Sequence, residues 1–494
     1  MNTKQSESTE GDVAPTPTDN LVTTQHSIKL GKKTLKYTVT TGTIVLKEES
    51  EKKGDKDGEF EGEKPKAEVF FIAYTRDDVK DKTVRPLTFS FNGGPGSSSI
   101  WMHLGLLGPR RVVAADTEPA APPYALQDNK HSLLDVSDLV FIDPVSTGYS
   151  RPVTGEKAKA FHGLKKDIES VGDFIRLYTT RYGRWTSPKY LIGESYGTTR
   201  ASALSEYLQM RHGMYLNGLM LISSVLNFQT LHFAAGNDLP YALFLPTYAA
   251  TAWYHGKLPK PLQDKPLREV LDEVETFAMR DYTLALMQGS SLSDKERQSI
   301  LNKLMRYTGL SKVYLEQTNL RINIHRFVKE LLRAERRTVG RLDSRIKGYD
   351  PDAAGEQSEF DPSLGTILGP YAGTFNDYIR EELGFESDLP YEVLKGLYQD
   401  WKWDKDNEYV NVAESLRKAM NLNPHLKIYV ANGYFDLATP YFATEYTFNH
   451  LGIEPELQEN ISMGYYDAGH MMYVHEASLK QMKRELAAFV EVSS

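Results

Sequence analysis

The chain has 494 residues, of which 40% are hydrophobic and 25% charged, as in an ordinary soluble globular protein. Its 66 acidic residues exceed its 58 basic ones, which gives a net charge of −8 at pH 7. Because proteins that bind duplex nucleic acid normally carry a basic excess, nucleic acid is disfavoured as the main partner. The chain contains no cysteine, which excludes disulfides, thiolate nucleophiles and cysteine-ligated zinc.

The first segment, residues 1–24, is polar and contains Pro15 and Pro17, so it is predicted to be a disordered tail. The apolar run of about 7–15 residues that a secretory signal requires does not follow Lys4. Nor does the chain hold a run of about 18 apolar residues, so no membrane-spanning helix is expected. These observations predict a cytoplasmic protein that has no membrane partner.

Residues 25–227 are predicted to form the first part of an α/β core. Residues 26–47 alternate apolar and polar side chains, which is typical of antiparallel strands, whereas residues 48–67 are mostly charges and glycines and predict a solvated loop. From residue 86 onward, strands and helices alternate with short turns, which predicts a parallel sheet with crossover helices. The elements expected there are strands at 86–91, 138–145, 189–195 and 218–226, and helices at 161–182 and 196–210.

Residues 228–410 lose the strand pattern and carry helical patterns rich in aromatic residues and proline, so they are predicted to form a mainly helical cap inserted into the core. Within them, residues 329–347 are locally basic, as expected of either a solvated helix face or a docking patch. Residues 411–494 are predicted to complete the core. The elements expected there are strands at 427–431 and 461–466 and a closing helix at 475–491.

A candidate nucleophile, Ser195, lies in the G-x-S-x-G pattern between Gly193 and Gly197. An apolar strand precedes the pattern and a helical pattern follows it. A sharp turn from strand to helix holds a serine in a strained conformation above the sheet, and glycine is needed on both sides because a Cβ atom there would clash. The alternative is a structural turn with an incidental serine.

A serine nucleophile also needs backbone N–H groups that stabilise the developing oxyanion. In a strand–turn–helix arrangement, the residue after the nucleophile, Tyr196, supplies one such amide. An earlier loop that follows a strand supplies the other, and residues 92–96 (NGGPG) occupy that place. The alternative is a glycine-rich turn without this function.

A serine of ordinary pKa needs a histidine base that is oriented by a carboxylate, in the chain order Ser, Asp or Glu, His. The histidines late enough in the chain are His425, His450, His470 and His475. We favour His470, because it follows a short strand and has a glycine beside it. We favour Asp436, which follows the strand at 427–431, over Asp467, which lies on the same loop as His470.

Together these segments resemble the serine carboxypeptidase family, a branch of the α/β-hydrolases. The matching segments are FNGGPGSSS (91–99), LLGPRR (106–111), LVFIDPVSTGYS (139–150), YLIGESYG (190–197), IYVANGYFDLATP (428–440) and DAGHMM (467–472). The resemblance implies an α/β-hydrolase fold with a mostly parallel sheet flanked by helices, and a cysteine-free, bacterial-type member of the family. It implies no cofactor, no metal and a peptide substrate.

The resemblance also implies a role for each matching residue. Ser195 would be the nucleophile, Asp436 the orienting carboxylate and His470 the general base and acid. The implied oxyanion amides are Gly94 and Tyr196, the implied ligands of a substrate's free carboxylate are Asn92, Gly93 and Glu194, and the residue implied to line the site beside the histidine is Met471. Because two carboxylates in contact repel each other unless one is protonated, a raised pKa is expected for Glu194.

Three positions depart from the family pattern. Leu106 stands where the family usually has a second glutamate, Ser90 replaces a frequent indole and Ser97 replaces the usual cysteine. The loss of the paired glutamate leaves open an esterase or acyltransferase that uses the same triad. A further alternative is a non-catalytic binding protein on a hydrolase fold, although such proteins usually lose a triad residue and all three are present in this sequence. The pattern HExxH of many metallohydrolases does not occur.

Overall fold

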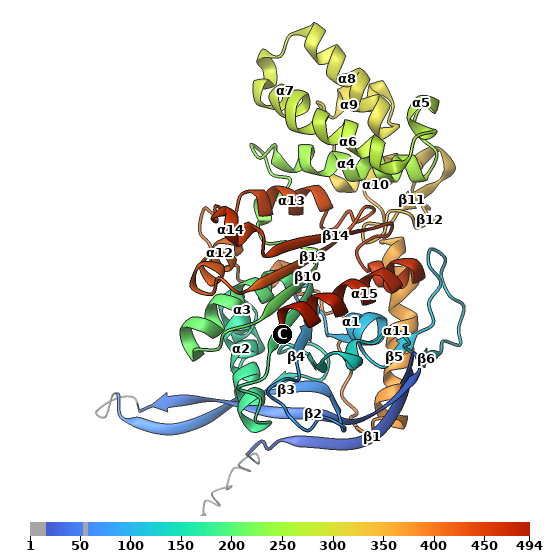
Figure 1. Ribbon diagram of the computed structural model, residues 1–494. Coiled ribbons are helices and arrows are strands. Elements are labelled where there is room, and N and C mark those ends of the chain that lie inside the picture. The colour runs from blue at the N-terminus through green and yellow to red at the C-terminus, as the bar shows by residue number, and fades with distance from the viewer. Residues whose placement is uncertain (1–15, 53–57) are drawn as a thin grey trace, which may run out of the picture.

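The computed structural model describes residues 16–52 and 58–494. A ten-stranded sheet forms its centre, in the order β1-β2-β3-β7-β4-β9-β10-β13-β14, with the short β8 paired to β3 (Figure 1). Pairs up to β3–β7 are antiparallel, and the six strands from β7 to β14 are parallel. The prediction of a mostly parallel core sheet is confirmed. The strands of this sheet are β1 (Asn20–Leu30), β2 (Lys33–Glu51), β3 (Phe60–Arg76), β4 (Leu87–Phe91), β7 (Asp138–Ile142), β8 (Arg151–Pro152), β9 (Lys189–Ser195), β10 (Gly218–Ser224), β13 (Lys427–Gly433) and β14 (Ile461–Tyr466).

Helices cover both faces of the sheet, because its parallel strands bury apolar side chains on each face. In β9, Tyr190 and Ile192 belong to one apolar cluster and Leu191 belongs to the other, as the alternation of side chains along a strand requires. The helices on the Leu191 face are α2 (Leu164–Arg181), α3 (Tyr196–His212) and α12 (Ala413–Leu422). Those on the opposite face are α1 (Ile100–Met102), α11 (Pro362–Glu381) and α15 (Glu476–Ser493).

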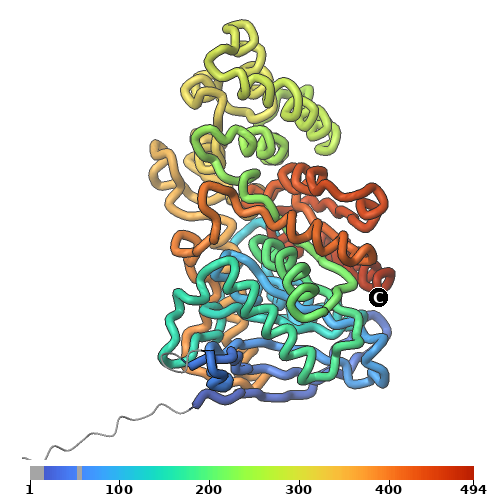
Figure 2. The backbone as a smooth tube through the Cα atoms, turned by 90° about the vertical axis from the view of Figure 1, so that its left-hand side faces the viewer, coloured from blue at the N-terminus to red at the C-terminus, as the bar shows by residue number. Residues whose placement is uncertain are grey.

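The cap is a separate helical body with its own apolar cluster, at the top of Figure 1 and Figure 2. Its helices are α4 (Leu239–Tyr254), α5 (Lys260–Gln263), α6 (Leu267–Phe277), α7 (Thr283–Gln288), α8 (Asp294–Thr308), α9 (Lys312–Gln317) and α10 (Ile324–Glu330). Its cluster also includes Phe435 and Leu437, which flank Asp436, and side chains of α13 (Tyr441–Asn449). The cap therefore rests on the loop that carries one of the predicted catalytic residues.

The cap is smaller than the predicted segment 228–410. Helix α11 packs against the core sheet together with α1, so this part of the segment returns to the core and the prediction is wrong there. A short hairpin of β11 (Arg337–Val339) and β12 (Lys347–Tyr349) follows the cap helices in the chain. A short helix, α14 (Pro455–Gln458), lies between α13 and β14 in the sequence. A second small hairpin, of β5 (Arg110–Val112) and β6 (Leu126–Asp128), lies beside α11.

The prediction of a loop at 48–67 is wrong at both of its ends, where the structure has strand instead: β2 extends to Glu51 and β3 begins at Phe60. Strands β2 and β3 continue outward as a long hairpin, which projects from the body at the lower left of Figure 1. Its ladder pairs Glu48 with Lys64 and Ser50 with Gly62. Both faces of this arm are largely exposed, so it needs no apolar alternation, and backbone pairing with cross-strand charges suffices. The predicted disordered tail is likewise wrong from Asn20, where β1 begins, and residues 1–15 lie outside the described part of the chain.

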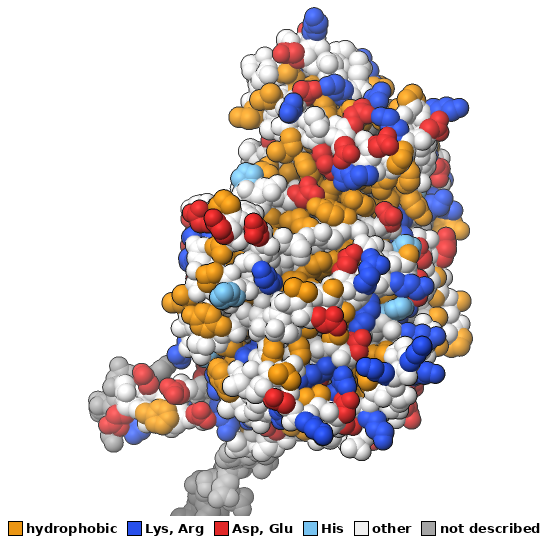
Figure 3. All heavy atoms as spheres, viewed as in Figure 1, with side chains coloured by type: hydrophobic (Ala, Val, Ile, Leu, Met, Phe, Trp, Pro, Cys, Tyr) orange, Lys and Arg blue, Asp and Glu red, His pale blue; other side chains and the backbone are white. Residues whose placement is uncertain are grey.

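The surface carries both signs of charge. Figure 3 shows acidic and basic side chains interspersed over the face in view. Among the residues that the structure describes, no helix is long and apolar enough to cross a bilayer.

Replacing a core residue close to Ser195 should destabilise the whole domain. Leu191 is fully buried in β9, so we expect Leu191→Ala to lower the free energy of unfolding by about 2–5 kcal/mol in urea denaturation. Leu284→Ala, at a site that is 58% exposed in the cap, is the control and should change stability by less than about 0.5 kcal/mol. Equal losses for the two variants would contradict the assignment of Leu191 to the core.

Candidate active site

Ser195 lies at the tight turn where β9 ends and α3 begins. Its backbone has φ 60° and ψ −128°, a conformation that is rare for residues other than glycine. A Cβ atom on Gly193 would lie 2.1 Å from the carbonyl oxygen of Gly197, and one on Gly197 would lie 2.7 Å from the carbonyl oxygen of Phe91. Both glycines are therefore required, and the predicted strained turn is confirmed.

Asp436 and His470 form a buried pair. The Asp436 carboxylate, in the loop after β13, accepts a hydrogen bond from His470 Nδ1 at 2.7 Å. Asp436 is fully buried, and it also accepts bonds from the amides of Ala438 and Thr439 and from the Thr439 hydroxyl. Burial alone would lower the pKa of His470, but the charge and hydrogen bond of Asp436 outweigh it, so this pKa is raised.

The parallel strands bring this pair close to the serine. Ser195 and Ser224 are register partners on β9 and β10, and the adjacent Ser223 hydroxyl donates to the carbonyl of His470 at 2.7 Å. Thr439, which contacts both Asp436 and His470, lines the same cavity as Ser195. The carboxyl ends of neighbouring strands thus bring Ser195 together with two residues that lie more than 240 positions later in the sequence.

The other candidates for the acid and base lie elsewhere. Asp467 is exposed, and His475 bonds to Ser478 at the start of α15. His450 bonds to the carbonyl of Tyr446 at the end of α13, and His425 is exposed. Of the predicted carboxylates and histidines, only Asp436 and His470 are joined to each other in the described structure.

A cavity of about 580 Å³ opens in front of Ser195, between the core and the cap. Gly94 and Tyr196 line it beside the serine. Tyr196 is the first residue of α3, so its amide belongs to the first turn, where N–H groups lack an acceptor within the helix. Within the described residues, neither this amide nor that of Gly94 donates a hydrogen bond to another group of the protein. Both are therefore free to bind an oxyanion in the cavity.

Glu194, Asn92 and Gly93 lie behind the serine, outside the set of residues that line this cavity. One carboxylate oxygen of Glu194 accepts from the Asn92 side-chain amide at 3.0 Å, and the other accepts from the hydroxyl of Tyr473 at 2.6 Å. Burial raises the pKa of Glu194 to about 7. The pKa of Glu194 is thus raised, as expected. The cause within the protein is the loss of solvent around the carboxyl, whereas the expectation rested on repulsion by a second carboxylate.

One position that departs from the family pattern, Leu106, follows a glycine that contacts Tyr473, the hydrogen-bond partner of this glutamate. Leu106 is buried, one residue after Gly105, where a Cβ atom would lie 2.5 Å from the Tyr371 hydroxyl and from the Tyr473 ring. Two phenols thus crowd the region where a second carboxyl is usual. No sequence pattern pointed to Tyr473, whereas Thr439 lies within the segment 428–440 that carries Asp436. Met471 packs beside Leu342 and Ile367, not on the lining of the Ser195 cavity, so its expected place is not confirmed.

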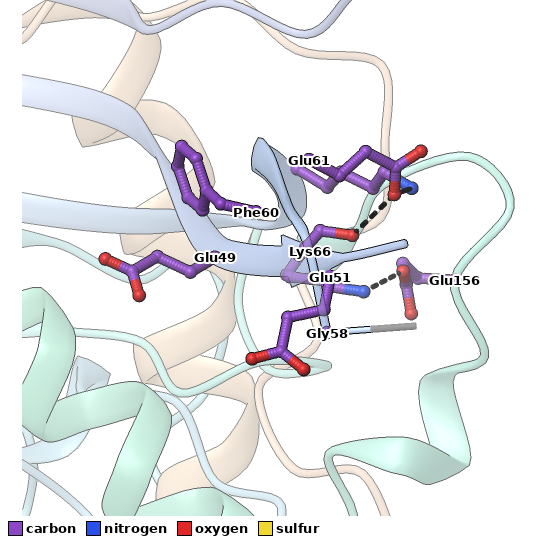
Figure 4. Close-up of a pocket in the computed structure, with 9 residues that line it drawn as sticks. Glu49, Glu51, Gly58, Phe60, Glu61, Lys66 and Glu156 are labelled. Atoms are coloured by element: carbon purple, nitrogen blue, oxygen red, sulfur yellow. Dashed lines mark hydrogen bonds and ion pairs between the residues drawn. The ribbon is translucent and has the colours of Figure 1, made fainter. Parts of the chain in front are cut away.

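A second cavity, of about 1120 Å³, lies on the projecting hairpin, and the serine on its lining, Ser50, donates to Glu61 at 3.0 Å with no histidine among its described lining residues (Figure 4). Its charged side chains pair with one another, as Lys66 does with Glu156 at 2.6 Å and Lys64 with Glu61 at 2.6 Å. In the described part of the chain, no cluster of three or more His, Asp or Glu side chains has a geometry that could hold a metal ion.

Comparison with known proteins agrees with this geometry. The family model for serine carboxypeptidases matches residues 60–483. The chain belongs to the serine carboxypeptidase family.

Curated relatives of this serine carboxypeptidase family member match over different lengths. Serine carboxypeptidase-like 29 of Arabidopsis thaliana is 30% identical over 26% of this chain and 26% of that protein, and the pheromone-processing carboxypeptidase KEX1 of Saccharomyces cerevisiae is 32% identical over 26% of this chain and 18% of that protein. The match thus spans about a quarter or less of the length of these two relatives. Serine carboxypeptidase-like 36 of Arabidopsis thaliana is 22% identical over 76% of this chain and 66% of that protein. These relatives come from a plant and a yeast, so the bacterial-type expectation stays a prediction.

The fold is shared with a solved relative. The crystal structure of Kex1(delta)p, a prohormone-processing carboxypeptidase from Saccharomyces cerevisiae, aligns with a TM-score of 0.52 at 17% identity and covers 91% of both chains. Together with the parallel sheet and the turn at Ser195, this likeness confirms the predicted α/β-hydrolase fold.

The raised pKa of Glu194 predicts a pH-dependent stability. Between 4.5, the ordinary value, and about 7, the folded carboxyl keeps a proton that the unfolded chain has lost, so the free energy of unfolding falls as the pH rises through this window. We expect Glu194→Gln to reduce the stability difference between pH 5 and pH 8 by up to about 3 kcal/mol in denaturant titrations.

The exposed Glu459→Gln is the matched control and should keep the pH dependence of the wild type. Some dependence should also persist in Glu194→Gln, because burial raises the pKa of Asp143 to about 7 as well. An unchanged pH dependence in Glu194→Gln would show that this glutamate is ionised in the folded protein from pH 5 upward.

Proposed function

We propose that this protein is a serine-type carboxypeptidase that releases C-terminal residues from peptides through an acyl-enzyme on Ser195. The observation that carries the proposal is the buried Asp436–His470 pair next to a strained serine that opens into a cavity. Membership of the serine carboxypeptidase family supports it. The proposal involves no cofactor.

In the proposed reaction, Ser195 Oγ attacks the carbonyl carbon of the scissile bond and gives its proton to His470 Nε2. Nδ1 of this ring already bonds to Asp436, which fixes the tautomer that leaves Nε2 free as a base and stabilises the imidazolium ion. The imidazolium then protonates the leaving amine, and the C–N bond breaks. Water, deprotonated by His470, attacks the ester carbon, and Ser195 recovers its proton as the peptide acid leaves.

The amides of Gly94 and Tyr196 bind the oxyanion in this proposal. Their support is their place on the cavity beside Ser195 and the lack of another acceptor in the described residues. Such donors act strongly because they are fixed in place before charge develops.

The proposed ligands of the substrate's terminal carboxylate are Asn92, Gly93 and Glu194. They are adjacent to the oxyanion loop and the serine in sequence, and the protonated form of Glu194, favoured below about pH 7, could donate a hydrogen bond to a carboxylate. Access to them from the cavity requires the substrate to reach behind Gly94.

Variants of the triad test the proposed roles. We expect Ser195→Ala and His470→Ala each to lower kcat/KM for an N-blocked dipeptide by at least about 10⁴-fold, and Asp436→Asn by about 10⁴-fold, because the three residues act as a unit. Circular dichroism and thermal melts should confirm that each variant folds. A Ser195→Ala variant that retained substantial activity would rule out the acyl-enzyme.

A substrate panel distinguishes this function from an esterase, an acyltransferase and a binding protein. A fluorophosphonate should label Ser195 in the wild type, and peptide mapping should find no label at this position in Ser195→Ala. N-blocked dipeptide acids should be cleaved with release of the C-terminal amino acid, measured from pH 4 to 8 beside the matching amides and ethyl esters. Ester hydrolysis or acyl transfer without peptide cleavage would favour the alternative enzymes, and a complete lack of labelling would favour a binding protein.

A further inference from the structure

The cavity in front of Ser195 has basic side chains on its lining and, among its described residues, no carboxylate to balance them. Arg341 and two histidines, His232 and His325, line it, whereas no Asp or Glu is found among its described lining residues. The remaining walls are largely aromatic and aliphatic, from both the core and the cap. Aromatic and aliphatic walls replace part of the water beside a fixed positive charge, which strengthens its attraction for an anion.

The backbone of Arg341 is fixed next to the triad. This residue lies in the loop between β11 and β12, its amide donates to the Asp361 carboxylate at 3.1 Å, and its carbonyl accepts from the amide of Leu437 at 3.1 Å. Leu437 directly follows Asp436. The position of this arginine is therefore tied to the loop that orients His470.

The side chain of Arg341, in contrast, has no partner among the described residues. It is exposed, and no described carboxylate lies within ion-pair distance of its guanidinium group. Three other basic residues of the segment 329–347 form ion pairs: Lys329 with Asp350 at 2.6 Å, Arg333 with Glu330 at 2.5 Å, and Arg345 with Asp343 at 2.7 Å and Asp116 at 2.9 Å. The predicted solvated helix face or docking patch is thus partly a set of internal ion pairs, and of its basic residues Arg341 is the one that lines the Ser195 cavity.

The charge of Arg341 shifts the pKa values of ionisable groups around the cavity. Burial is the main cause that lowers the pKa of His325, and Arg341 lowers it further. Arg341 also opposes the rise in the pKa of the Tyr398 phenol, which burial causes, and the rise in the pKa of His470. His325 and Tyr398 line the cavity on separate elements, and His470 is buried beside it, so the guanidinium lies within electrostatic reach of all three.

From this geometry we propose that Arg341 binds a carboxylate group of the substrate inside the Ser195 cavity. The inference rests on the proposed function. A guanidinium matches a carboxylate with two parallel hydrogen bonds, and Arg341 is the lining residue that can make them. The two sources of the carboxylate are the free C-terminus of the peptide and an acidic side chain on the residue that acylates Ser195.

Glu194, a proposed ligand of the terminal carboxylate, differs from Arg341 because its protonated form offers a single hydrogen bond and no positive charge. Its carboxyl is buried behind the serine and both of its oxygens accept hydrogen bonds from protein groups. Two basic residues that follow residues 92–96 in the sequence are also engaged in contacts within the protein. His103 is buried and bonds to the Tyr74 hydroxyl, and Arg110 pairs with Asp128 and Glu382.

Binding to an inactive protein tests the proposal independently of catalysis. Ser195→Ala is titrated by calorimetry with four ligands: N-blocked Phe-Leu as acid and as amide, and N-blocked Glu-Leu amide and Gln-Leu amide. We expect the added variant Arg341→Gln to weaken binding about 10–100-fold for the ligand that supplies the carboxylate, because a hydrogen-bonded charge pair is lost. Arg341→Lys should retain part of the affinity, because it keeps the charge but not the two parallel bonds.

The pattern of losses identifies the source. A loss for Phe-Leu acid but not for its amide assigns the terminal carboxylate, and a loss for Glu-Leu amide but not for Gln-Leu amide assigns the side chain. Arg336→Gln, an exposed arginine of the same segment that does not line the cavity, is the matched control and should change neither ratio. Equal effects of Arg341→Gln on charged and uncharged ligands, or no effect, would overturn the proposal.

Kinetics on the Ser195 enzyme then separate the two hypotheses. The ratio of kcat/KM for the charged substrate over its uncharged match should fall by the same 10–100-fold in Arg341→Gln. If the wild type cleaves none of these substrates while Arg341 still discriminates carboxylates in the binding assay, the proposed peptidase function fails and the Arg341 inference stands. If peptides are cleaved with no dependence on Arg341, the reverse holds.

Discussion

The turn at Ser195 exists because backbone segments approach one another more closely than a Cβ atom allows. Gly193 meets Gly197 across the turn, and Gly197 meets Phe91 of the neighbouring strand β4. This close packing forces Ser195 into its strained conformation and sets the amide of Tyr196 at the start of α3. The loop that contains Gly94 follows β4 directly, so the same contact brings the second amide to the cavity. A single packing constraint therefore positions the serine and both candidate donors.

Arg200, in helix α3, stabilises this packing through hydrogen bonds of its side chain. Its buried guanidinium donates to the carbonyl of Asn92 at 2.7 Å and to Asp167 at 2.9 Å, and Asp167 also accepts from the Tyr196 hydroxyl. The hydrogen bond to Asn92 thus connects helix α3 to the loop after β4, and the ion pair with Asp167 connects α3 to α2. Burying such charges is costly unless each is fully paired, and here each is paired within the protein.

The sequence was most informative where periodicity and turn chemistry agree. Strands β4, β7, β9 and β10 and helices α2 and α3 lie within a few residues of their predicted positions, because buried parallel strands are short apolar runs and their helices repeat apolar residues every three to four positions. Asp436 and His470 could be selected because each follows a strand of the sheet. The projecting hairpin was missed because exposed strands need no apolar face, so a run of charges hid them.

The long insertion shows a different limit. Helical periodicity marks α11 as a helix but does not say which body it packs against, and only the tertiary structure places it on the core. For the same reason, no pattern singled out Arg341 or Tyr473: each gains its significance from neighbours that are distant in the chain. Which residues a side chain or helix contacts depends on the tertiary structure and cannot be deduced from the neighbouring sequence.

The cap and the loop of Asp436 share one apolar cluster, through Phe435 and Leu437. The cap and this loop are consequently not structurally independent. The apolar contacts that attach the cap to the core also hold the loop of Asp436 in place. Exchanging caps between relatives, or loosening this one by evolution, would disturb the geometry of His470 unless the anchor residues were retained. Sequence variation is consequently expected in helices α7 to α9, at the end of the cap that is far from the core, because changes there leave the anchor residues Phe435 and Leu437 in place.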